Sequence, residues 1–195
     1  TCAVIANMIK ELVNAKPDAK LGLATGGTPV PIYKKLIEMN KAGEVDFSRV
    51  HTVNLDEYCG IPGTHDQSYR YFMDTNLFDH INIDKKNTFV ASGMGDFEAN
   101  ARELEEKVRE GGGVDLQLLG IGNNGHIAFN EASDHLIAVA HTEKLTESTI
   151  NANARFFEKK EDVPTMAITM GMGDILAAKK VVLAATGLAK VPAIK

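Results

Sequence analysis

The stretch Leu118 to Glu131, LLGIGNNGHIAFNE, predicts a buried strand that ends in a glycine-rich turn. Its glycines at positions 120, 122 and 125 allow positive φ angles and a close approach of the backbone to a ligand. His126 supplies an imidazole that changes charge near neutral pH, and the Glu131 carboxylate could orient it or raise its pKa. This combination suits proton transfer. A structural histidine in an ordinary loop is the competing interpretation, and the stretch alone leaves the two evenly weighted.

The composition of the whole chain predicts one α/β domain that binds a small ligand. A length of 195 residues, 44% of them hydrophobic, is enough for one sizeable core. The net charge of -5 and the lack of a lysine- or arginine-rich block argue against nucleic acid and anionic membranes as partners. No apolar run approaches the roughly 20 residues that span a bilayer, and no signal peptide is recognisable. Cys2 and Cys59 match no metal or redox spacing, which fits free thiols in a reducing cytoplasm.

Strand and helix patterns alternate along the chain and predict βαβ units on a parallel sheet. Strands are expected at 20–24, 50–55, 88–91, 114–119, 166–170 and 181–185. Helices are expected at 3–13, 30–39, 68–77, 97–109, 145–157 and 171–178, with a loop or short strand at 133–141. Because open parallel sheets bind ligands at the carboxyl ends of their strands, residues that directly follow the strands are the site candidates.

The first strand-to-helix connection predicts an anion site. It reads Thr25-Gly26-Gly27-Thr28-Pro29. Free backbone N–H groups and the positive end of the following helix point at the same place, and phosphate is their natural occupant. The sequence is neither a dinucleotide fingerprint nor a P-loop, so it implies no nucleotide. A plain strand-to-helix connection is the competing interpretation.

Two adjacent acids, Asp56 and Glu57, follow the next strand. Successive strand residues face opposite ways, so one carboxylate can enter the crevice while the other turns toward the scaffold. We assign Asp56 to the crevice, although the pattern barely separates the two, and both could be solvated acids at a strand end. Arg155 and Lys190 are candidate anion ligands, with an exposed surface pair and an ordinary exposed lysine as the competing interpretations.

Taken in order, the motifs of this chain resemble those of the glucosamine-6-phosphate deaminase/isomerase family. They are LATGGTP at 23–29, NLDEY at 54–58, SYRYFM at 68–73, GIGNNGHIAFNE at 120–131 and NARFF at 153–157. The resemblance covers essentially the whole length. It implies a Rossmann-like, mostly parallel sheet flanked by helices with an extra layer. It also implies conversion of glucosamine 6-phosphate and water to fructose 6-phosphate and ammonia, without a metal or an organic cofactor.

The resemblance also assigns roles to residues of the sequence. Asp56 would move a proton between C2 and C1 of the sugar through an enolamine, and His126 would open the pyranose ring. Glu131 would hold the imidazole in the right tautomer and charge. Some relatives have an acid where this chain has Asn124, so a proton relay through that position stays open. The implied phosphate ligands are Thr25, Gly26, Gly27, Thr28, Arg155 and Lys190.

Departures from the family pattern limit what the resemblance implies. Members that N-acetylglucosamine 6-phosphate activates carry basic residues where this chain has His141 and Glu143, so we do not expect that activation here. Residues 1–195 are expected to form a single catalytic domain without the family's opening strand and closing segment. The family ranges from monomers to hexamers, so a homo-oligomer is allowed but no state is fixed.

Two other functions fit parts of the pattern. A 6-phosphogluconolactonase shares the phosphate turn and a Gly-His element, but its hydrolysis needs no base at Asp56, and it typically lacks the Phe-Asn-Glu tail found at 129–131. Sugar-phosphate-sensing domains of bacterial regulators resemble the same fold without turning over a ligand. They would be expected to lose the acid and the histidine that are present here. Both alternatives rank below the deaminase.

Overall fold

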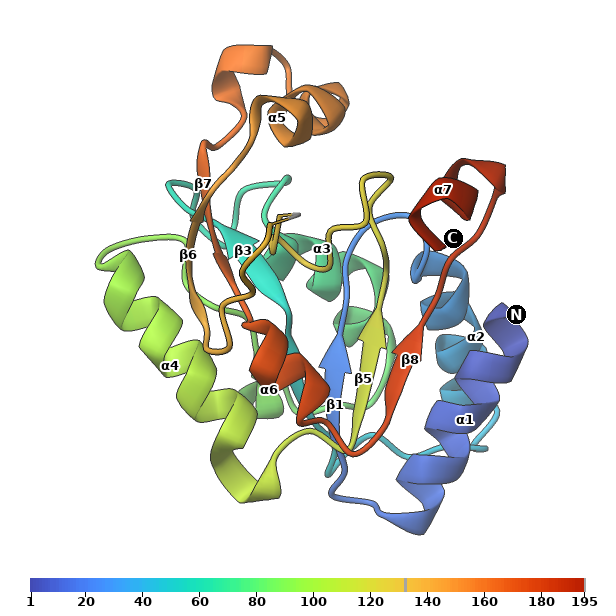
Figure 1. Ribbon diagram of the computed structural model, residues 1–195. Coiled ribbons are helices and arrows are strands. Elements are labelled where there is room, and N and C mark those ends of the chain that lie inside the picture. The colour runs from blue at the N-terminus through green and yellow to red at the C-terminus, as the bar shows by residue number, and fades with distance from the viewer. Residues whose placement is uncertain (132, 195) are drawn as a thin grey trace.

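The computed structural model describes residues 1–131 and 133–194, and within them a five-stranded parallel sheet forms the centre of the molecule (Figure 1). The strand order is β4-β2-β1-β5-β8. The strands are β1 (Lys20–Leu23), β2 (His51–Asn54), β4 (Thr88–Phe89), β5 (Leu116–Leu119) and β8 (Val181–Leu183). The central strands β1, β2 and β5 are almost entirely buried, as expected for a parallel sheet covered on both faces. The predicted fold class is confirmed.

A smaller antiparallel sheet was not predicted from the sequence. In the described part of the chain it has three strands, in the order β3 (Asp56–Tyr58), β7 (Met166–Thr169) and β6 (His141–Lys144). The pattern placed Asp56 at the end of the preceding strand. Instead, the chain passes from one sheet to the other at Leu55. The N–H of Leu55 donates to the carbonyl of Leu23 in β1, and its carbonyl accepts from the N–H of Met170, just after β7. The acids therefore begin a strand of the second sheet.

Helices cover both faces of the parallel sheet (Figure 1). One face is covered by α1 (Cys2–Ala15), α2 (Val30–Lys41) and α3 (Tyr69–Asn76). The other face is covered by α4 (Phe97–Arg109) and α6 (Met172–Leu176). The remaining α-helices are α5 (Glu147–Asn153), beyond the ends of β6 and β7, and α7 (Val191–Ile194), after β8. Short 3-10 turns lie at Phe78–His80, Lys85–Asn87, Glu110–Gly112, Ala154–Phe156, Lys160–Asp162 and Leu188–Lys190. No helix in this part of the chain is long and apolar enough to cross a membrane.

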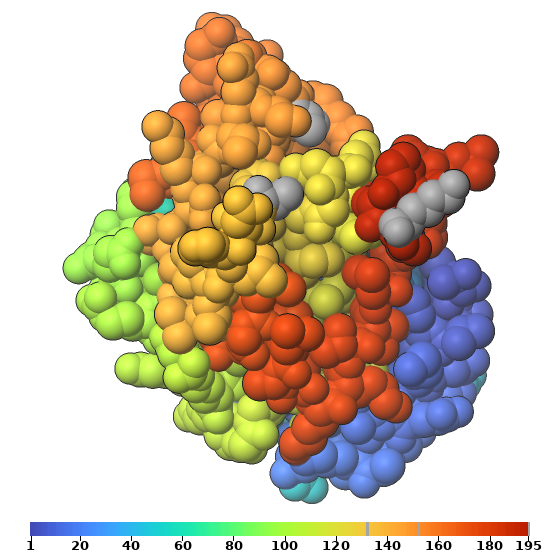
Figure 2. Space-filling model, viewed as in Figure 1, coloured from blue at the N-terminus to red at the C-terminus, as the bar shows by residue number. Residues whose placement is uncertain are grey.

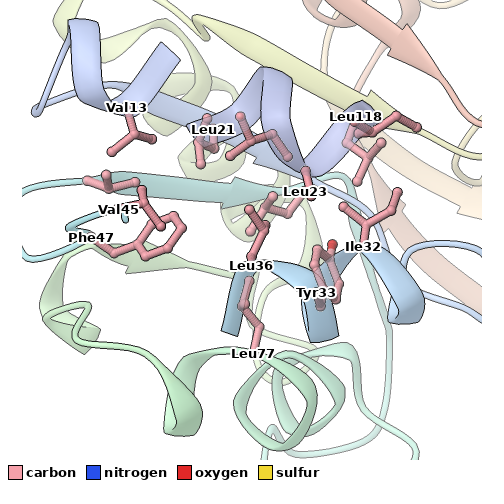
Figure 3. Packing of buried hydrophobic residues seen from close by; sticks show 14 of the residues in the cluster. Val13, Leu21, Leu23, Ile32, Tyr33, Leu36, Val45, Phe47, Leu77 and Leu118 are labelled. Carbon is pink, nitrogen blue, oxygen red and sulfur yellow. The ribbon is translucent and has the colours of Figure 1, made fainter. Parts of the chain in front are cut away.

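The main apolar core fixes the position of the first glycine turn. Leu21 and Leu23 of β1 pack against Ile32 and Leu36 of α2 (Figure 3). Tyr33 is fully buried in the same cluster, and its hydroxyl donates a hydrogen bond to the carbonyl of Ala24 at the end of β1. Because strand and helix are tied directly on both sides of the turn, the backbone between them has little freedom to move.

Candidate active site

The Thr25 to Pro29 turn presents unused donors beside the beginning of a helix. Gly26 and Gly27 are exposed, and Gly26 has a φ of 89°, which only glycine adopts freely. The N–H groups of Gly26, Gly27 and Thr28 donate no hydrogen bond to any residue within the described ranges. α2 begins directly afterwards, at Val30. This geometry suits an anion.

The two adjacent acids have different environments. Glu57 is 1% exposed and accepts hydrogen bonds from the N–H groups of Tyr58, Tyr69 and Arg70, at 2.8, 2.9 and 3.0 Å. It therefore holds the beginning of α3 against β3 and is the acid turned toward the scaffold. Asp56 is 7% exposed, and its carboxylate makes no hydrogen bond to another described residue. Burial raises the pKa of Asp56 to about 8, and the nearby charge of Glu57 adds to the rise.

The side chains of His126, Asn124 and Glu131 form a chain of hydrogen bonds. Nδ1 of His126 lies 2.6 Å from Oδ1 of Asn124, and Nδ2 of Asn124 donates to Oε2 of Glu131 at 3.2 Å. Because the amide oxygen can only accept, Nδ1 carries a proton, and Nε2 is left as the free nitrogen of the neutral ring. Burial lowers the pKa of His126, against the opposing effect of the Glu131 charge, and the Lys190 charge lowers it further. The neutral imidazole is therefore favoured near pH 7.

The resemblance implied that Glu131 holds the imidazole. Among the described residues, however, the Glu131 carboxylate bonds to Asn124, Thr146 and Thr149, and not to the His126 ring. Its Oε2 accepts from Asn124, and its Oε1 accepts from the hydroxyls of Thr146, at 3.0 Å, and Thr149. Burial would raise the pKa of Glu131, but these hydrogen bonds outweigh that effect and lower the pKa. The charged carboxylate orients the amide, and the amide orients the ring.

Two features of this arrangement escaped the sequence analysis. A Cβ on Gly122 would lie 2.3 Å from ring atoms of His126, so only glycine leaves room for the ring. Thr146 and Thr149 were missed because they lie beyond the motif. Thr146 is the N-cap of α5 and accepts from the N–H of Thr149, and this local capping pattern in the sequence is a signal that could have located them.

The two predicted cations lie in different surroundings. Lys190 is close enough for its charge to lower the pKa of His126. The guanidinium of Arg155 instead stacks on Phe156, 4.6 Å from the ring centroid, and within residues 1–131 and 133–194 no hydrogen bond or ion pair joins it to the glycine turn. Figure 2 shows a hollow between the lobe of α5 and the C-terminal segment, with the surface of the loop after β5 at its base.

Two cavities lie outside the candidate site. In the described ranges no group of three or more His, Cys, Asp or Glu side chains is placed to hold a metal ion. A cavity of about 320 Å³ lies between α4 and α6, and another of about 490 Å³ lies beside His65 and Phe157. Neither cavity is lined by any of the predicted site residues.

Known proteins share both the sequence and the fold of this chain. A glucosamine-6-phosphate deaminase of Clostridium beijerinckii is 54% identical over 193 residues, 98% of this chain and 80% of the relative. The corresponding protein of Thermoanaerobacter pseudethanolicus is 53% identical over 191 residues, 97% of this chain and 76% of the relative.

Solved structures agree with these relatives. A monomeric glucosamine-6-phosphate deaminase matches with a TM-score of 0.90 at 40% identity, over 93% of this chain and 76% of that chain. A 6-phosphogluconolactonase of Thermotoga maritima matches with a TM-score of 0.77 over 99% of this chain and 81% of that chain, and at 22% identity it shows the shared fold alone. The model of one family, described as glucosamine-6-phosphate isomerases/6-phosphogluconolactonase, matches residues 1–195. The resemblance is thus confirmed, and the chain belongs to this family of glucosamine-6-phosphate isomerases and 6-phosphogluconolactonases.

Proposed function

We propose that this chain is an enzyme that converts glucosamine 6-phosphate and water to fructose 6-phosphate and ammonia. The observation that carries the proposal is the state of Asp56, a buried carboxylate with a raised pKa and no hydrogen-bond partner among the described residues. A buried acid of this kind is typical of a proton-transfer group. The relatives that are 53–54% identical are named as deaminases, which favours the same reaction here.

In the proposed reaction the sugar is anchored by its phosphate at the Thr25 to Thr28 turn, with Lys190 as a cationic ligand. Such anchoring fixes the reacting carbons relative to the catalytic groups and supplies part of the rate. Nε2 of neutral His126 accepts the proton of the C1 hydroxyl and returns it to the ring oxygen as the ring opens. Arg155 is proposed as a second phosphate ligand, and it would have to leave its stacking contact with Phe156 to serve.

Asp56 then acts as the base in the isomerisation of the open-chain sugar. Its carboxylate removes the proton from C2, the C1–C2 double bond forms, and the C1 oxygen takes a proton from the sugar's own ammonium group to give the enolamine. Asp56 returns a proton to C1, which leaves an iminium at C2. Water adds to C2 and ammonia leaves, giving fructose 6-phosphate. Asp56 must be ionised when it begins, so we expect activity to increase as the pH rises toward its pKa of about 8.

Asn124 and Glu131 are proposed to act through the histidine. A carboxamide does not accept a proton at neutral pH, so no proton relay passes beyond the ring. Asn124 instead keeps Nδ1 protonated and Nε2 free for the sugar. We further propose that the reaction takes place in the cytoplasm, and that the chain's partners are small sugar phosphates and, as the family allows, further copies of itself.

The proposal is tested by ammonia release from glucosamine 6-phosphate. We expect Asp56→Asn and His126→Gln each to lower kcat by about 10²–10⁴-fold, the usual contribution of a general acid or base. Asp18→Asn, the same change at an exposed acid, is the matched control and should keep wild-type activity. Failure of the folded wild type to release ammonia while it still binds fructose 6-phosphate would contradict the proposal. Release of acid from 6-phosphogluconolactone would then favour the lactonase.

A further inference from the structure

Asn130 ties the histidine loop to the second sheet. It is 7% exposed, and its Nδ2 donates to the carbonyl of Met170 at 2.8 Å, to the carbonyl of Ile127 at 3.1 Å and to the hydroxyl of Thr169 at 3.5 Å. Its backbone N–H also donates to the carbonyl of Ile127, at 3.0 Å. The two donors of the amide are therefore used inside the protein, and they close the turn that separates His126 from Glu131.

Thr169 lies between that turn and the acid. It is fully buried at the end of β7, and its hydroxyl accepts from the N–H of Phe129 at 3.2 Å. In the antiparallel sheet Thr169 is the register partner of Asp56 on β3. One hydroxyl therefore lies on the strand beside Asp56 and also holds the loop that carries His126.

Two more features fix the same loop. The ring of Phe129 packs against both Tyr58 and Tyr69, with centroids 5.4 and 5.9 Å away, and is buried in that aromatic cluster. Ala128 has a φ of 53°, an unusual value for a residue with a Cβ. A strained turn of this kind persists only where the surrounding contacts determine it.

We infer that Asn130 and Thr169 are positioning residues that hold His126 at a fixed place relative to Asp56, without touching the sugar. For the reaction this inference rests on the proposed function, since the ring-opening group and the carbon-acid base must serve one bound sugar in turn. Proton transfer needs its groups within about 3 Å of the reacting atoms, and a misplacement of about 1 Å can lower the rate 10²-fold.

The test replaces Thr169 by Val, which keeps the shape and removes the hydroxyl. We expect kcat to fall by about 10-fold or more with KM changed less than about threefold, since the phosphate turn is unaffected. We also expect the NMR titration of the His126 imidazole, assigned with His126→Gln, to move from its lowered pKa toward the ordinary value as the ring loses its buried place. Thr169→Ser, which restores the hydroxyl, should recover both properties.

The matched control is Thr52→Val, the same change at another buried strand residue. The Thr52 hydroxyl has no hydrogen-bond partner among the described residues, so kcat and the His126 titration should stay at wild-type values. If Thr169→Val only lowers the free energy of unfolding, with kcat and the titration unchanged, Thr169 is merely structural and the inference is wrong. If the wild type releases no ammonia but Thr169→Val still moves the titration, the proposed function fails while the positioning role stands.

Discussion

At the scale of single residues, the main feature of the candidate site is Asp56, a carboxylic acid whose charged form is disfavoured by burial. Asp56 is buried next to Glu57, and a pKa near 8 means that the folded chain holds a proton there which the unfolded chain releases near pH 4. Between these two pH values the folded state binds more protons than the unfolded state, so this group makes the protein less stable as the pH rises. A stability cost of this kind is common at functional sites.

We therefore predict that Asp56→Asn stabilises the protein while it lowers its activity. Each pKa unit corresponds to about 1.4 kcal/mol, so the gain in the free energy of unfolding should reach a few kcal/mol by pH 9 and shrink toward pH 5. Urea unfolding of both proteins at pH 5, 7 and 9 measures the difference. A variant that is no more stable than the wild type at pH 9 would show that the Asp56 carboxylate is not disfavoured in the fold.

The sequence was enough to nominate most of the candidate site residues, and the structure shows why it could not distinguish all of them. The glycine turn, Asp56 and His126 follow strands, and strand ends are visible in the hydrophobic pattern. The pattern could not separate Asp56 from Glu57, because the distinction depends on the N–H groups of Tyr69 and Arg70, which reach Glu57 from a helix further along the chain. Contacts of this kind are fixed by tertiary packing and leave no periodic signal.

At the scale of elements, a cluster of ion pairs links the N-terminal ends of the parallel strands, opposite the end that carries the candidate site. The side chain of Asp115, just before β5, accepts from Lys16 after α1 and from Lys179 before β8, both at 2.7 Å, and from the N–H of Lys20 at 2.8 Å. Burial alone would raise the pKa of Asp115, but these hydrogen bonds together lower it to about 2. The cluster thereby links the segments at which three neighbouring strands begin.

We predict that Asp115→Asn lowers the free energy of unfolding by about 2 kcal/mol at pH 7. A group with a depressed pKa contributes stability that is present above its unfolded pKa, near 4, and is lost as the pH falls toward 2. The difference between the variant and the wild type should therefore shrink below pH 4. Thermal unfolding at pH 7 and pH 3 measures it, and kcat should stay at the wild-type value. A variant as stable as the wild type at pH 7 would refute this role of the cluster.

Elements were predictable where they are long and regular. The helix at 97–109 was predicted with the bounds it has, because its charged and apolar faces repeat with helical period. The second sheet was missed because β3 spans only Asp56–Tyr58 and β6 is largely polar, which leaves too few residues for an alternating pattern. Its pairing is antiparallel, and β3 pairs with β7 across a long separation in the sequence, Asp56 with Thr169, so nothing local indicates it.

At the scale of the whole molecule, two sheets bring distant segments to one place. The parallel sheet carries the glycine turn and the histidine loop at the carboxyl ends of β1 and β5, where open α/β sheets bind their ligands. The antiparallel sheet carries Asp56 and, through β7, the contacts that hold the loop. Neither sheet alone contains both Asp56 and His126, the two proposed proton-transfer groups. Asp56 is instead linked to the histidine loop through its register partner Thr169, which accepts from Phe129.

The central claim is that Asp56 moves a proton between C2 and C1 on one face of the sugar. The most direct test is turnover of glucosamine 6-phosphate in D₂O, with the position of deuterium in the fructose 6-phosphate read by NMR. We predict that the new hydrogen, carried over from C2 or exchanged with D₂O while it is on Asp56, enters only one of the two C1 positions, because one fixed base delivers it. We also predict that Asp56→Asn forms the product at least about 10²-fold more slowly. Deuterium at both C1 positions, or the same labelled product from Asp56→Asn at the wild-type rate, would contradict the claim.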